Sequence, residues 1–277
     1  MTNARIRLFA LGLGLAATTR AQTSALPPQL EQQFETCVQA QKAGKLDMAE
    51  KCLLDLIAKG GKASFVLNNL GIVYQQKSEH NRAIARFREA IGLEEDYGAP
   101  HYLLGISLLA IGRDSGAVSE LARAVQLLPE KNRARVALAQ AYERTGDLLS
   151  AVDERTAVSD AHPQDPEPLY QLARAHQKLA ASCFERMKQV NPASARVYQV
   201  LGESEIIQGH TDRAIDAFRK AAEADPKLAG SHLALSFIFA GQGRTKEAID
   251  ETSRELAVAP ESAAALGLQR KLQSSQP

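Results

Sequence analysis

The stretch that decides the fold is ARVYQVLGESEIIQGHTDRAIDAFRKAAEADPKL, residues 195–228. Gly209 stands between its two halves, and Pro226 stands near its end. Glycine readily adopts the left-handed backbone that ends a helix, and proline cannot continue one. The stretch therefore predicts two helices joined by a tight turn.

The same pattern recurs along the chain with a period of 34 residues. Units begin at Leu30, Ser64, Gly98, Asn132, Pro166, Ala195 and Ala229, and the fifth unit is shortened. Position 7 is Leu in six units, position 8 is always small, position 15 is Gly in five units, and position 32 is Pro in five. Position 20 is alanine throughout, at Ala49, Ala83, Ala117, Ala151, Ala180, Ala214 and Ala248. Small residues at positions 8 and 20 predict the point where two antiparallel helices approach closely.

These columns resemble the tetratricopeptide repeat (TPR), and the resemblance covers roughly residues 30–275. In the quoted unit, Tyr198, Leu201-Gly202, Ala214, Phe218 and Pro226 match its pattern. The resemblance implies an all-α fold, a TPR-type α-solenoid of antiparallel helix pairs that winds as a right-handed superhelix. Residues 261–274 carry Leu266, Leu268 and Leu272 but no second half-repeat, which predicts a C-terminal capping helix.

Composition agrees with an all-helical protein. Alanine fills 46 of the 277 positions, while aromatic residues make up 5%. Lys and Arg number 33 against 32 Asp and Glu, so the formal net charge is +1. Such a balance argues against sequence-independent nucleic-acid binding, which depends on a basic field.

The shortened fifth unit predicts a long helix. His176 and Ala180 stand four residues apart where other units leave nine, and no Gly, Pro or Asn intervenes. Four residues make about one helical turn, so the two helices of the unit can fuse with the same face inward. An apolar series from Leu169 to Val190 steps by three or four residues, which predicts one helix over 167–190 with Cys183 on its inner stripe.

Residues 1–21 have the features of a secretory signal peptide of the exported bacterial type. Arg5 and Arg7 precede the apolar run 8–17, and Thr19 and Ala21 fit a cleavage site before Gln22. The apolar run is about half the length of a membrane span, so an uncleaved anchor is the weaker interpretation. Cleavage would lower the formal net charge to −2.

The predicted organisation has five parts. A signal peptide (1–21) and a short linker (22–29) precede an N-terminal arm of four repeats (30–165). The long helix occupies the shortened repeat (166–194), and the C-terminal arm with its capping helix follows (195–275).

Local signatures of catalysis, cofactor binding and metal binding do not appear in the sequence. No two of the six histidines form an i, i+4 pair, and His101 and His232 occupy position 4, where a packing role is expected. The glycines at 241 and 243 fall on an inter-helix turn and lack the order of a phosphate loop. We therefore predict a non-enzymatic protein with no catalytic residue, cofactor or metal.

Three cysteines would meet an oxidising compartment after export. Cys37 at position 8 and Cys52 at position 23 of the first unit could form a disulfide. Two buried, unpaired thiols are the favoured interpretation, and Cys183 is expected to be buried as well.

The family resemblance implies that positions 2, 5, 9 and 12 of each unit face a concave groove. Apolar residues beside amides at these positions suit a peptide partner, although Ile72, Ile106 and Leu109 could equally serve helix packing. Phe34 and Val38 at positions 5 and 9 of the first unit exclude the Lys and Asn clamp that some relatives use for a terminal carboxylate. The candidate groove residues are Phe65, Asn68, Ile72, Gln75, Tyr102, Ile106, Leu109, Gln140, Tyr170, Arg174, Gln199 and Phe237.

The sequence thus predicts a protein-binding or peptide-binding scaffold of the periplasm or cell envelope, without stable membrane insertion after signal cleavage and without nucleic acid. The alternative is a stable accessory subunit of an envelope enzyme or transport complex. Partner identity and oligomeric state stay open.

Overall fold

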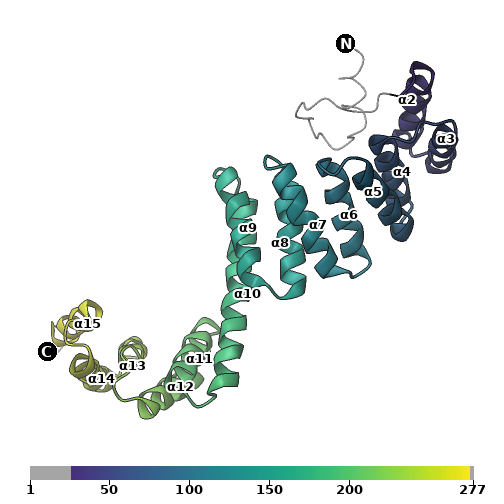
Figure 1. The fold of residues 1–277 in the computed structure, drawn as a ribbon. Coiled ribbons are helices and arrows are strands. Elements are labelled where there is room, and N and C mark those ends of the chain that lie inside the picture. The colour runs from purple at the N-terminus through teal and green to yellow at the C-terminus, as the bar shows by residue number, and fades with distance from the viewer. Residues whose placement is uncertain (1–25, 275–277) are drawn as a thin grey trace. The chain divides into compact units, whose positions relative to one another are not determined.

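The computed structural model describes residues 26–274, so the predicted signal peptide and the first half of the linker lie outside the described residues. Within 26–274 the chain forms fourteen α-helices and no strand (Figure 1). They belong to two compact units, one ending at Gln177 and the other beginning at Lys178. The all-α solenoid prediction is confirmed.

The first unit consists of helix pairs in which consecutive helices contact one another. Its helices are α2 (Pro28–Lys42), α3 (Leu46–Ala58), α4 (Ser64–Gln76), α5 (His80–Leu93), α6 (Gly98–Ala110), α7 (Asp114–Leu127), α8 (Asn132–Thr145) and α9 (Leu148–Ala161). One apolar core runs through these pairs, and it includes Phe34, Leu53, Leu70, Leu104 and Leu138.

The second unit repeats the arrangement with a core of its own around Ala214, Phe218, Leu235 and Phe239. Its helices are α11 (Ala195–Ile207), α12 (Thr211–Ala224), α13 (Ser231–Gly241), α14 (Thr245–Val258) and α15 (Ala263–Ser274). Helix α15 packs on α13 and α14 through residues such as Leu268 and Leu272, which confirms the capping helix.

The turn at position 15 has the predicted left-handed backbone. Gly44, Gly112 and Gly146 have φ values of 72°, 75° and 84°. In the repeat that begins at Ser64, position 15 is Ser78, and its φ is also positive, at 61°. The fold therefore imposes this conformation even where the residue is not glycine.

The paired helices approach closely at position 8, as predicted. The side chain nearest to position 8 is, however, the one at position 24 and not the predicted alanine at position 20. A Cβ atom added at Gly71, Gly105 or Gly202 would come within 3.0 Å of the side chain at position 24. That residue is Phe87, Leu121 or Phe218. Alanines at position 20 are fully buried in six repeats, so they too belong to the helix contact.

Helix α10 (Pro166–Val190) is the predicted fused helix, continuous over 25 residues. Its apolar stripe does not face inward as expected, because Ala175 is its only buried residue. Leu169 is 50% exposed and Val190 is 80% exposed. Cys183 is exposed rather than buried, since no helix among residues 26–274 packs along this stripe.

Cys37 and Cys52 form a disulfide, with an S–S distance of 2.02 Å. The prediction of two unpaired thiols was wrong. The cysteines stand on the facing helices α2 and α3 with their Cα atoms 5.4 Å apart, which brings both sulfur atoms into the core of the first repeat.

Candidate peptide-binding face of the first unit

The first helices of the four leading repeats, α2, α4, α6 and α8, form a contiguous layer because each contacts the next in the series. The rings of Phe34 and Phe65 join α2 to α4 edge to face, 5.0 Å between centroids. Gln75 joins α4 to α6, since its Nε2 donates to the carbonyl oxygen of Leu103 at 3.3 Å and to Oγ of Ser107 at 3.1 Å. The layer is thus a rigid surface built from one face of each helix.

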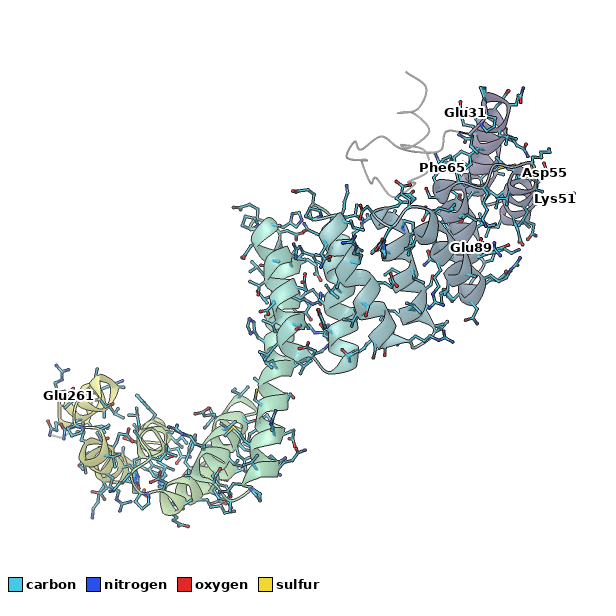
Figure 2. All side chains as sticks on the ribbon, in the orientation of Figure 1. Glu31, Lys51, Asp55, Phe65, Glu89 and Glu261 are labelled. Atoms are coloured by element: carbon cyan, nitrogen blue, oxygen red, sulfur yellow. A yellow bond between two sulfur atoms is a disulfide. The ribbon has the colours of Figure 1, made fainter. Side chains whose placement is uncertain are left out.

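Four candidate residues lie half-buried on this layer. They are Phe65, Ile72, Tyr102 and Ile106, all packed against the apolar core. Figure 2 labels Phe65 on α4, beside the first repeat. Burial raises the pKa of the Tyr102 phenol, although Arg133 opposes the shift. The layer therefore offers partly accessible aromatic and aliphatic side chains, which suit contact with apolar side chains of a partner.

Asn68 stands among these residues on α4 but is not exposed as the groove prediction required. Its exposed fraction is 0%, because close packing of the helices around α4 encloses it. Neither its Nδ2 nor its Oδ1 has a hydrogen-bond partner among residues 26–274. Its neighbour Asn69 is also buried but donates from Nδ2 to the carbonyl oxygen of Phe65 at 2.7 Å. Since buried polar groups are nearly always paired, Asn68 is an exception that calls for an explanation.

Other predicted groove residues already serve the fold. Leu109 is buried in the core, and its carbonyl oxygen accepts a hydrogen bond from Nη1 of Arg144 on α8 at 2.9 Å. The Gln75 amide is used by the contact with α6. Gln140 is exposed on α8.

The remaining candidates lie on α10 and in the second unit. Tyr170 and Arg174 are exposed on α10, with the guanidinium 5.9 Å from the ring centroid. Gln199 is buried, and its Nε2 donates to the carbonyl oxygen of Ala229 at 3.3 Å. Phe237 is 51% exposed. The first unit is therefore the place where candidate residues gather on one layer.

An ion cluster that sequence reasoning missed joins the first and second repeats. Lys77 binds Asp47 at 2.8 Å and Glu50 at 2.6 Å, and Arg82 also binds Glu50 at 2.6 Å. Burial raises the pKa of Glu50, but the hydrogen bonds from Lys77 and Arg82 outweigh it and leave the pKa lowered. These residues occupy no repeat column, so their spacing carried no signal. The cluster fixes α3 against α4 and α5, a structural role.

The histidines at position 4 pack beside carboxylates. Nδ1 of His101 lies 2.7 Å from Oε2 of Glu120, and Nδ1 of His232 lies 2.6 Å from Oε2 of Glu251. Both carboxylates stand at position 23 of their repeats. Among residues 26–274, no group of three or more His, Cys, Asp and Glu side chains is placed to hold a metal ion. Over the same range, no helix has the length and apolar character to cross a membrane.

Comparison with family models identifies the repeats. One tetratricopeptide repeat model matches residues 68–130 and 102–166, and a second matches residues 195–228. The chain contains tetratricopeptide repeats. The second match coincides with the quoted stretch, and the matches together include the candidate residues of α4 from Asn68 onward and those of α6 and α8. A search of curated proteins found no match.

Two solved structures are similar to this chain at low sequence identity. MamA from Desulfovibrio magneticus RS-1 is 17% identical with a TM-score of 0.48, over 74% of this chain and 100% of that chain. The C-terminal part of a TPR repeat-containing protein from Cytophaga hutchinsonii is 16% identical with a TM-score of 0.48, over 85% of this chain and 98% of that chain.

Proposed function

We propose that this TPR protein is a non-enzymatic scaffold that binds a peptide segment of a partner protein on the first-helix layer of its first unit. The observation that carries the proposal is the unpaired amide of Asn68. An amide side chain has two donor hydrogens and one acceptor oxygen, so it can pair with both an N–H and a C=O group of a peptide main chain.

The energetics favour a ligand as the missing partner. Leaving a buried polar group unpaired costs about 1–3 kcal/mol, so the unbound protein is less stable than it would be with an apolar residue at position 68. The half-buried Phe65 and Ile72 stand on α4 about one turn on either side of Asn68. The half-buried Tyr102 and Ile106 stand on α6, which contacts α4. Rotation of these side chains would admit the main chain of a partner to the amide and leave apolar surface for its side chains.

We further propose that the protein works in the periplasm or cell envelope. The support is the charge, length and cleavage pattern of residues 1–21, together with the Cys37–Cys52 disulfide, which belongs to an oxidising compartment. The mass of the mature chain, which would begin at Gln22, tests this proposal.

The binding proposal makes opposite predictions for stability and capture. Asn68→Leu keeps the branched shape and removes the unpaired amide, so the free energy of unfolding of the first unit should rise by about 1–3 kcal/mol. Combined with Tyr102→Ala, it should weaken capture of proteins from the envelope fraction by about 2–4 kcal/mol, roughly thirty- to a thousand-fold in affinity. Immobilised mature chain and quantitative mass spectrometry of the captured proteins measure the second effect.

Two controls separate binding from folding. Asn69→Leu removes an amide that is already paired, so it should lower stability without a comparable effect on capture. Arg86→Ala with Glu89→Ala removes a half-buried ion pair on α5, outside the first-helix layer, and should leave capture unchanged. If the α5 variant abolishes capture and the Asn68 variant does not, the partner binds another face. A single, tightly co-purifying partner would instead favour a stable accessory subunit.

A further inference from the structure

Helix α10 retains the residues of a complete repeat although it lacks the turn between the two halves. Leu172 and Ala173 stand at positions 7 and 8 of the shortened repeat, and Ala180 and Phe184 stand at positions 20 and 24. In the repeats that begin at Ser64, Gly98 and Ala195, position 8 lies directly against position 24. The shortened repeat therefore has both sides of this contact.

One continuous helix cannot make that contact with itself. Ala173 and Phe184 are eleven residues apart, which separates them by roughly 16 Å along a helix that rises about 1.5 Å per residue. Because this contact is missing, the two residues are less buried than their counterparts in other repeats. Phe87 and Phe218, also at position 24, are 0% and 2% exposed, whereas Phe184 is only half-buried and Ala173 is exposed.

Much of the apolar stripe of α10 is accessible in the structure of residues 26–274. Leu172, Leu179 and Met187 are half-buried, and His176, Ala180 and Cys183 are exposed, as are the end residues Leu169 and Val190. A packed helix of this apolar character would bury this face. The stripe is thus an apolar surface that is only partly buried.

The stripe is nearly the same when read from either end. Counted from the midpoint between residues 179 and 180, Leu172 mirrors Met187, and His176 mirrors Cys183. Leu169 and Val190 mirror each other at the ends. In an antiparallel pair of identical helices related by a two-fold axis, each of these residues meets its mirror position on the other copy, so apolar residues meet apolar residues at both ends.

We propose that the partner of α10 is α10 of a second copy of this chain. The two helices pack antiparallel, with the two-fold axis close to Ala180, which shares the face of Ala173 and Phe184, so that position 8 of each copy meets position 24 of the other. Each pairing then restores the contact that the missing turn prevents within one chain. Exchange of equivalent elements between copies is an established route to dimers when a connecting loop is too short to fold back.

A cysteine scan tests the pairing in the mature chain. In a Cys183→Ser background, Ala180→Cys lies near the proposed axis, and oxidation should link two copies by a disulfide. Glu185→Cys lies on the opposite side of α10 and serves as the matched control, which should stay unlinked. Linkage at Glu185 without linkage at Ala180 would overturn the proposal.

Restoring the turn provides a second and independent test. Replacing residues 177–179 with IIQGHTDR, the corresponding residues 206–213, recreates the normal spacing between positions 11 and 20. The two halves of the repeat can then pair within one chain, so sedimentation should show a dimer for the wild type and a monomer for this variant. Phe184→Ala should weaken dimerisation about thirtyfold or more. A wild type that sediments as a monomer up to about 0.1 mM, whether or not other proteins bind α10, would refute the inference.

Discussion

Two glycines of the second unit provide a matched test of how closely the paired helices pack. Gly202 lies within α11 and Gly267 within α15. A Cβ atom at Gly202 would lie 2.8 Å from both Cε1 and Cζ of the Phe218 ring, whereas one at Gly267 would meet no atom within 4 Å. Substitution by alanine thus adds the same methyl group to a full site and to an open one.

We expect the two substitutions to have different effects on the free energy of unfolding. Alanine is favoured over glycine in a helix interior by about 1 kcal/mol, and both variants gain this helix propensity. Phe218 is a rigid ring with 2% exposure, so the added methyl group at Gly202 forces a shift that costs about 1–3 kcal/mol. We expect Gly267→Ala to stabilise its helix by about 1 kcal/mol, and Gly202→Ala to range from neutral to about 2 kcal/mol destabilising.

Hydrogen exchange measures both effects where they occur. Repeats couple chiefly to their neighbours, so amides of α11 and α12 should lose protection in Gly202→Ala, while amides of α15 should gain protection in Gly267→Ala. Equal stabilisation by the two substitutions would show that α11 and α12 do not approach as closely at Gly202 as the structure places them.

Two further predictions concern export and pH. The intact mass of protein recovered from producing cells should correspond to a chain that begins within a few residues of Gln22 and carries one disulfide; a full-length cytoplasmic mass would exclude export. Burial lowers the pKa of His101, but hydrogen bonding to Glu120 and to the Glu95 carbonyl outweighs it, so the pKa is raised. A raised pKa in the folded state stabilises the protein below the unfolded value of about 6.5, and the effect is lost as pH rises through the folded pKa. In the wild type, hydrogen-exchange protection of α6 and α7 should therefore fall as the pH increases through the folded-state pKa of His101. Glu120→Gln should remove this pH dependence.

Most of the parts of the fold that could be predicted are those that recur from repeat to repeat. Gly at position 15 and Pro at position 32 recur because each repeat ends its helices at the same place, and recurrence makes a local preference into a reliable signal. The Cys37–Cys52 disulfide occurs once, and its spacing allowed a disulfide while two unpaired thiols were the favoured interpretation. Whether the two thiols pair depends on how α2 packs on α3, and a feature that occurs only once in the sequence gives no information on that packing.

The candidate site shows the same limit. The family resemblance placed Asn68 and Tyr102 on one face of their helices, and both lie on the first-helix layer. It could not show that Tyr102 is half-buried while Asn68 is fully enclosed, because exposure depends on the neighbouring helices. Nor could it show that Gln75 pairs with Ser107, a contact made across 32 residues.

Two departures from the repeat pattern illustrate how the solenoid responds to change. Ser78 replaces glycine at position 15, yet the backbone keeps the left-handed turn, because the helices on either side of it remain paired. The strain of about 1–2 kcal/mol at one residue is smaller than the loss of that pairing would be. The shortened spacing between His176 and Ala180 instead removes the turn itself, and no local adjustment can bring Ala173 to Phe184. The first change is absorbed within a repeat, whereas the second transfers the need for a packing partner to another molecule.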